Sequence, residues 1–141
     1  MKKLLMMAAA LIVTASAMAQ KADEVIKVAA EKIDFGKIKQ GVPVTTFFEV
    51  KNTSGKPVVI ENAWGSCGCT TPEVPKAPIM PNASTKLKVQ YNAAALGSFN
   101  KDVYIKLAGI DEPKVLKITG EVLEGTAYDA AKKGAVSKKS K

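Results

Sequence analysis

The sequence of 141 residues contains no histidine and no arginine, so all 21 of its basic side chains are lysines. Histidine is the commonest general base and metal ligand in enzymes, and its absence removes most nucleophile–base pairs and closed metal sites. Arginine supplies the paired hydrogen bonds with which proteins read guanine and phosphate. We therefore expect a non-catalytic protein that uses no cofactor and binds no nucleic acid.

Long apolar runs are also lacking, since spanning a bilayer takes about 20 residues. The longest run covers residues 4–13 and follows Lys2 and Lys3. The small-x-small triplet Ala17-Met18-Ala19 comes shortly after it, which is typical of a cleavable secretory signal. We interpret residues 1–19 as a signal peptide that sends the mature chain, from Gln20 onward, to the periplasm or the cell exterior.

Acidic side chains are absent from the last ten residues, which contain five lysines, whereas residues 20–131 hold 14 lysines and 13 acids. The excess positive charge of the mature chain therefore lies at its C-terminal end. Apolar periodicity stops after Leu123, and we predict a disordered basic tail over residues 124–141. Such a tail would associate weakly with anionic surfaces without inserting into a bilayer.

The mature chain shows little sign of helix and instead alternates polar and apolar residues. Apart from Thr46 and Gly120, apolar side chains recur at every second position in four segments, residues 44–50, 87–91, 103–107 and 116–122. Turn clusters separate them, and two further strands are expected near residues 25–35 and 58–62. The pattern predicts an all-β protein, a single immunoglobulin-like antiparallel β-sandwich of about seven strands over residues 25–123.

Cysteine occurs only at Cys67 and Cys69, and three interpretations of the pair stay open. In an exported protein the thiols are expected to oxidise, and Gly68 supplies backbone freedom for a bridge whose three-residue loop adds only about 1.6 kcal/mol. A small-ring disulfide is also easily reduced, which suits thiol–disulfide exchange. Two thiolates and the thioether of Met80 would instead suit a soft ion such as Cu(I).

Aromatic residues are few, with one tryptophan, three tyrosines and four phenylalanines. The tryptophan comes just before the cysteines, in a segment, residues 64–80, that we expect to be a loop. Loops at the end of a sandwich often carry contacts, and the candidates here are Trp64, Thr70, Thr71 and Pro72. The alternative for Trp64 is partly buried packing at the end of the sandwich. Two interpretations of Phe47, Tyr91 and Tyr104 stay open: an aromatic strip for sugar binding, or strand positions that face the core or a neighbouring strand.

Several short motifs between residues 33 and 122 form a recognisable set. They are Ile33-Asp34-Phe35-Gly36-Lys37-Ile38 with Gly41, Phe48-Glu49-Val50-Lys51-Asn52-Thr53, Ser66-Cys67-Gly68-Cys69-Thr70-Thr71-Pro72, Ile79-Met80-Pro81-Asn82, and Leu116-Lys117-Ile118-Thr119-Gly120-Glu121-Val122. Together they resemble the DUF1573 family of bacterial secreted proteins, common in Bacteroidetes. The resemblance implies an immunoglobulin-like sandwich related to ASH and Hydin-type domains, which are regarded as interaction modules. Pro81-Asn82 stands where the family usually has Pro-Gly, and asparagine also tolerates positive φ.

These observations favour a non-catalytic, exported binding or scaffolding module of the cell envelope, whose partner is an envelope protein or a polysaccharide. The alternative is a protein that acts through the Cys67-Gly68-Cys69 motif, in thiol–disulfide exchange or in binding a soft metal.

Overall fold

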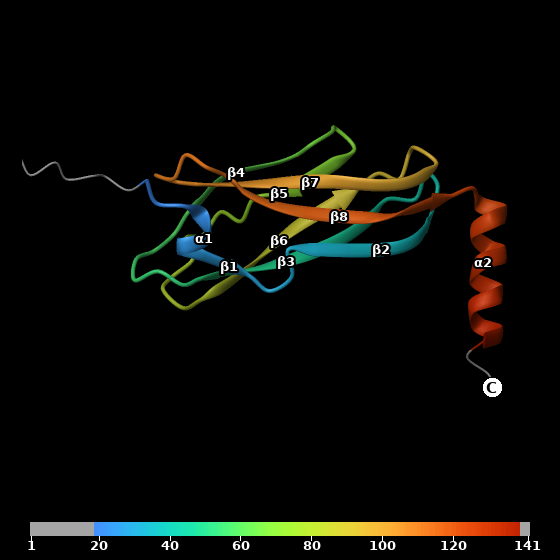
Figure 1. Cartoon of the computed structure of the whole chain (residues 1–141), viewed down its shortest axis with the longest axis horizontal. Helices are drawn as coiled ribbons and strands as arrows, with labels where there is room; N and C mark the ends of the chain where they lie inside the picture. The colour runs from blue at the N-terminus through green and yellow to red at the C-terminus, as the bar shows by residue number, and fades with distance from the viewer. Residues whose placement is uncertain (1–18, 139–141) are drawn as a thin grey trace, which may run out of the picture.

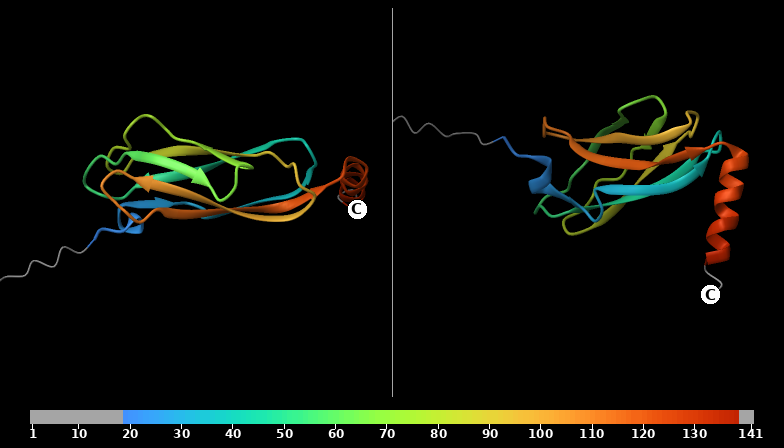
Figure 2. Two further views of the ribbon diagram at one scale, coloured as in Figure 1. Left: turned by 90° about the horizontal axis from the view of Figure 1, so that it is seen from above. Right: turned by 45° about the vertical axis from the view of Figure 1, so that its right-hand side comes forward.

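The computed structural model describes residues 19–138, which form a sandwich of two four-stranded sheets (Figure 1, Figure 2). Sheet 1 has the strand order β1-β3-β6-β5, and sheet 2 has the order β2-β8-β7-β4. The predicted all-β sandwich is confirmed, with eight strands where about seven were expected. The elements are α1 (Ala22–Val25), β1 (Ile26–Val28), β2 (Lys32–Lys39), β3 (Val44–Asn52), β4 (Ile60–Gly65), β5 (Thr70–Glu73), β6 (Ser84–Tyr91), β7 (Gly97–Leu107), β8 (Lys114–Leu123) and α2 (Gly125–Lys138).

The alternation of side chains places one face of each sheet in the core. Phe48 of β3 and Leu87 of β6 are buried on the inner face of sheet 1, and Ile105 of β7 and Leu116 of β8 are buried on the inner face of sheet 2. The intervening residues of these strands point outward, because successive side chains of a strand alternate between its faces. The outer faces of the two sheets are therefore the main surfaces open to a partner.

The prediction of one N-terminal strand over residues 25–35 is wrong, because the chain crosses from one sheet to the other within this segment. The backbone N–H of Ala29 donates to Glu49 of sheet 1, and two residues later the carbonyl of Glu31 accepts from Lys117 of sheet 2. The segment therefore splits into β1 and β2. Because β2 enters sheet 2 from this crossing, it runs parallel to β8, so the sandwich is not antiparallel throughout.

The turn cluster that follows β3 is organised by Asn52, whose side chain is fully buried. Its amide nitrogen donates to the carbonyl oxygens of Lys56 (2.7 Å) and Ile79 (2.8 Å). Its amide oxygen accepts from the backbone N–H of Ser54 (2.8 Å) and from the Ser54 hydroxyl (2.7 Å). The buried Asn52 amide thus connects the turn to the segment before β6. Its desolvation penalty is small because the amide oxygen and nitrogen both have hydrogen-bond partners.

The disordered tail expected over residues 124–141 is wrong for Gly125–Lys138, which form the helix α2 that projects from the end of the sandwich (Figure 1). Residues 139–141 lie outside the described part. Alanine and lysine are strong helix formers, and their propensity requires no amphipathic pattern. An exposed ion pair between Lys39 and Asp129 (3.5 Å) joins α2 to β2. The predicted signal peptide falls almost wholly on residues 1–18, which lie outside the described part. Within residues 19–138 no helix is long and apolar enough to cross a membrane.

Candidate functional site

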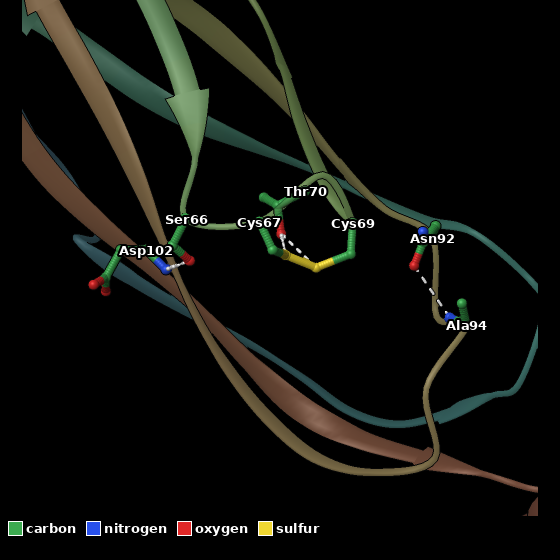
Figure 3. Close-up of a disulfide and its surroundings, with 7 residues drawn as sticks. All are labelled: Ser66, Cys67, Cys69, Thr70, Asn92, Ala94 and Asp102. Atoms are coloured by element: carbon green, nitrogen blue, oxygen red, sulfur yellow. Dashed lines mark hydrogen bonds between the residues drawn. A yellow bond between two sulfur atoms is a disulfide. The ribbon is translucent and has the colours of Figure 1, made fainter.

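Cys67 and Cys69 lie in the short crossover that carries the chain from sheet 2 to sheet 1 (Figure 3). β4 ends at Gly65 and β5 begins at Thr70, so residues 66–69, which we call the disulfide turn, make the whole connection. The two cysteines form a disulfide with their Cα atoms 5.2 Å apart. The expected loop over residues 64–80 is therefore wrong in part, because residues 64–65 belong to β4 and residues 70–73 form β5.

Backbone hydrogen bonds hold the disulfide turn on both sides. Ser66 donates its N–H to the carbonyl of Asp102 (2.9 Å), and its Oγ accepts from the N–H of Asp102 (3.1 Å). At the other side, the carbonyl of Cys69 accepts from the N–H of Asn92 (3.0 Å). The turn is therefore fastened to β7 of sheet 2 and to the segment after β6 of sheet 1.

Thr70 lies beneath the disulfide and is only 4% exposed. Its Oγ1 lies 3.7 Å from the sulfur of Cys67 and 3.8 Å from the sulfur of Cys69 (Figure 3). Gly65 packs directly on Thr70, since a Cβ at residue 65 would lie 2.4 Å from the carbonyl oxygen of Thr70. Thr70 is therefore not available to a partner as the sequence suggested, and it contacts the sulfurs instead.

Gly68 was expected to supply the backbone freedom for the bridge. The φ angle of Gly68 does not lie in the left-handed region. Gly68 is exposed, and a Cβ at this position would meet no atom within 4 Å. The turn thus closes without a conformation reserved for glycine, and the glycine that the geometry requires is Gly65.

Trp64 lies on the outer face of sheet 2, where it is 39% exposed and stacks on Tyr104 with ring centroids 5.4 Å apart. The strand register pairs Trp64 of β4 with Tyr104 of β7, and Tyr104 with Val115 of β8. Val115 is 41% exposed. These three side chains, which we call the Trp64 strip, form a band across the neighbouring strands β4, β7 and β8.

Ion pairs border the Trp64 strip on both sides. Asp102 lies two residues before Tyr104, on the same face, and accepts from the Nζ of Lys117 (2.6 Å). Lys106 lies two residues after Tyr104, and its Nζ is 3.5 Å from a carboxylate oxygen of Glu61. The strip therefore has an apolar centre and a charged but internally neutralised border.

Not all of the sequence-derived candidates come together. Thr71 is exposed on the outer face of sheet 1, and Pro72 is partly exposed on the same strand, so neither shares a surface with Trp64. Cys69 precedes the end of β5 that pairs with Tyr91, whereas Met80 lies before Ser84, at the opposite end of β6. About 20 Å of strand separates these ends, at about 3.3 Å per residue.

The alternative soft-metal site is therefore not formed, because Met80 lies at the other end of the sandwich from the cysteines, which are joined in a disulfide. Residues 19–138 contain no cluster of three or more cysteine and acidic side chains suited to a metal ion. The aromatic strip for sugar binding is also not formed, and the alternative of separate strand positions applies. Tyr91 is buried and stacks on Phe99, Phe47 lies on the outer face of sheet 1, and Tyr104 lies on that of sheet 2.

A family model described as "Protein of unknown function (DUF1573)" matches residues 26–122. The chain belongs to the DUF1573 family. This confirms the resemblance found in the sequence motifs. Comparison with curated proteins finds no match for this DUF1573 chain.

Solved structures share the fold of this DUF1573 chain at low sequence identity. A protein of unknown function from Porphyromonas gingivalis W83 has a TM-score of 0.57 and 18% identity, over 69% of this chain and 46% of that one. The ASH/PapD-like domain 7 of human CEP192 has a TM-score of 0.55 and 10% identity, over 72% and 87%. The VesB protease of Vibrio cholerae gives 0.54 and 13%, over 72% and 33%. This chain thus spans less than half of the Porphyromonas chain, and identities this low establish the fold alone.

Sequence reasoning missed the grouping of Tyr104 and Val115 with Trp64 in this DUF1573 chain. Alternation already placed Tyr104 opposite to its buried neighbours Val103 and Ile105. However, 40 residues separate Trp64 from Tyr104, and alternation within each strand does not say which strands pair. The register of β4 with β7 is the information that the sequence pattern lacked.

Proposed function

We propose that this protein is a non-catalytic binding module of the cell envelope, and that the Trp64 strip is its contact surface for a protein partner. The observation that carries the proposal is the exposed, stacked Trp64–Tyr104 pair in register with Val115. Large apolar side chains that gather on an exposed sheet face are characteristic of interaction surfaces. Tryptophan and tyrosine are also the residues most enriched among those that dominate binding energy.

The surroundings of the strip favour a protein over a polysaccharide as partner. The pairs Asp102–Lys117 and Lys106–Glu61 satisfy one another, so they present a polar border rather than free hydrogen-bond groups for sugar hydroxyls. An apolar centre inside a polar border is the usual anatomy of a protein–protein interface. The disulfide turn and its hydrogen bonds to Asp102 hold the end of β4 next to this surface, which limits the ordering cost of binding.

Export to the envelope is proposed from the sequence features of residues 1–19, and the fold is compatible with it. Immunoglobulin-like sandwiches present rigid faces and end turns, and they need no cofactor to bind a partner. We therefore combine the predicted export signal, the sandwich scaffold and the apolar Trp64 strip in one proposal.

Photo-cross-linking in native cells tests the proposal. A benzophenone amino acid replaces Val115, the residue at one end of the strip, and the same amino acid replaces Phe47 on the opposite outer face as a matched control. We expect a discrete protein adduct from residue 115 that disappears when Trp64→Ala is added, and none from residue 47. Equal adducts from both positions, or an adduct of residue 115 with polysaccharide only, would refute the proposed surface.

A further inference from the structure

The disulfide contributes little to holding its own turn. A bridge that closes a three-residue loop restricts the unfolded chain by only about 1.6 kcal/mol. Hydrogen bonds from Ser66 to Asp102 and from Asn92 to Cys69 already fix both sides of the turn, and Thr70 donates its N–H to the carbonyl of Cys67 (3.2 Å). Opening the bridge therefore leaves the sandwich, and the path of the turn, with their other supports.

The disulfide turn is also partly open to solvent, so an external thiol can approach it. Cys67 and Cys69 are both partly exposed, and they lie in a turn on the border of the sandwich (Figure 3). The residue between them, Gly68, has no side chain and open space around it. Since the chain has no third cysteine, the pair is self-contained and cannot reshuffle with another thiol of the same molecule.

One hydroxyl serves both sulfur atoms. The Oγ1 of Thr70 lies at almost the same distance from each sulfur, 3.7 and 3.8 Å. Within residues 19–138 it makes no other hydrogen bond, and the close packing of Gly65 on Thr70 fixes its position. The hydroxyl can therefore donate to whichever sulfur becomes a thiolate, and a hydrogen bond to a charged acceptor is stronger than one to a neutral acceptor.

From this arrangement we infer that Cys67 and Cys69 form a reversible thiol–disulfide exchange site that opens and closes without unfolding the protein, with the Thr70 hydroxyl stabilising the leaving thiolate. The inference does not rest on the proposed binding function. The substrate class is a small or protein thiol, and glutathione serves as the probe.

Two glutathione molecules reduce the disulfide in two steps. A glutathione thiolate attacks one cysteine sulfur, the cysteine S–S bond breaks, and the other cysteine leaves as a thiolate that accepts the Thr70 hydrogen bond. A second glutathione thiolate attacks the glutathione sulfur of the mixed disulfide and releases the first cysteine. Two glutathiones are oxidised to one glutathione disulfide, and the protons that they lost end on the two cysteine thiols.

The test is an equilibrium titration of the mature protein with mixtures of reduced and oxidised glutathione, quenched with acid, alkylated and read by intact mass. We expect a transition from an unalkylated to a doubly alkylated chain, with an unchanged circular dichroism spectrum. A bridge that stays oxidised at every ratio, or that opens only as the spectrum is lost, would overturn the inference.

Reduction rates test the part assigned to the hydroxyl. Thr70→Val keeps the shape but lacks the donor, and we expect glutathione to reduce it about tenfold more slowly than the wild type. Thr70→Ser keeps the donor and should react at the wild-type rate. Thr70→Ala gives the same comparison if the valine variant does not fold. Equal rates with and without the hydroxyl would overturn its assigned role.

Discussion

Gly65 and Gly68 are three residues apart in one connection, but their surroundings are opposite. A Cβ at residue 65 would lie 2.4 Å from the carbonyl oxygen and 2.7 Å from the Cβ of Thr70, both of which are parts of a strand that cannot yield easily. A Cβ at residue 68 would enter open space. Only Gly65 is therefore required by the packing of β4 against β5.

The matched pair Gly65→Ala and Gly68→Ala tests this difference. We expect Gly65→Ala to lower the free energy of unfolding by about 1–3 kcal/mol, the usual cost of overpacking. Gly68→Ala should stay within about 0.5 kcal/mol of the wild type, as exposed substitutions generally do. Chemical denaturation of both variants measures the two values. A larger loss for Gly68→Ala than for Gly65→Ala would show that the turn is organised differently.

Lys114 fixes the N-terminal segment to β8 by pairing with Asp23 of α1 and with Glu31 just before β2. Burial alone lowers the pKa of Lys114, but the hydrogen bonds and charges of Asp23 and Glu31 outweigh burial and raise the pKa above its ordinary value. The folded protein therefore holds this proton more tightly than the unfolded chain does.

The stabilisation by these pairs is complete below the ordinary lysine pKa of about 10.4 and is lost as the pH rises through the raised value. We expect the difference in unfolding free energy between the wild type and Lys114→Met to be constant from roughly pH 7 to pH 9. Above about pH 10.4 it should shift steadily against the wild type. Denaturation at a series of pH values measures this difference, and a difference that stays constant in strong alkali would contradict the role given to Lys114.

At the scale of the elements, the helix α2 lies against Lys37 and Lys39 on the surface of β2. An ion pair joins Lys39 to Asp129, and both side chains are largely exposed. Exposed pairs of this kind contribute about 0.2–1 kcal/mol. Deleting the chain after Glu124 should therefore change the melting temperature by at most about 4 °C. A much larger fall, measured by circular dichroism, would mean that α2 is part of the folded core.

The same deletion should reduce retention on anionic lipid vesicles at low salt, because the lysines of the C-terminal end are removed. Lys132→Gln with Lys133→Gln is the matched control, since it lowers the charge and keeps the helix. We expect it to lose part of the retention. Retention equal to that of the full chain in both variants would rule out electrostatic association.

A comparison of the predicted and observed elements shows which of them the alternation pattern specifies. Alternation predicted β3, β6, β7 and β8 with their inner faces, because a two-residue period assigns a side chain to a face without knowledge of its neighbours. It failed at residues 25–35, where the change of sheet at Ala29 and Glu31 is decided by distant backbone partners. It failed again after Leu123, where intrinsic helix propensity, not periodicity, specifies α2.

At the scale of the whole molecule, the sandwich turns residues distant in sequence into surfaces. Cys67 and Trp64 were recognised from the sequence because scarce residue types stand out, but Tyr104 and Val115 reach Trp64 only through strand pairing. The same pairing separates Met80 from the cysteines and Thr71 from Trp64. The place of the candidate site could therefore be predicted from the sequence. Which residues form the site could not, because that depends on the register of the strands.

The affinity of the cross-linked partner for two single variants tests most directly whether the Trp64 strip is the binding surface. Phe47→Ala is the matched control, since Phe47 is an exposed aromatic residue on the other sheet. We expect Trp64→Ala to weaken binding about 30-fold, as the loss of a dominant interface residue does, with its circular dichroism spectrum unchanged. Phe47→Ala should bind as the wild type does. Wild-type affinity for Trp64→Ala, or an equal loss for both variants, would contradict the claim.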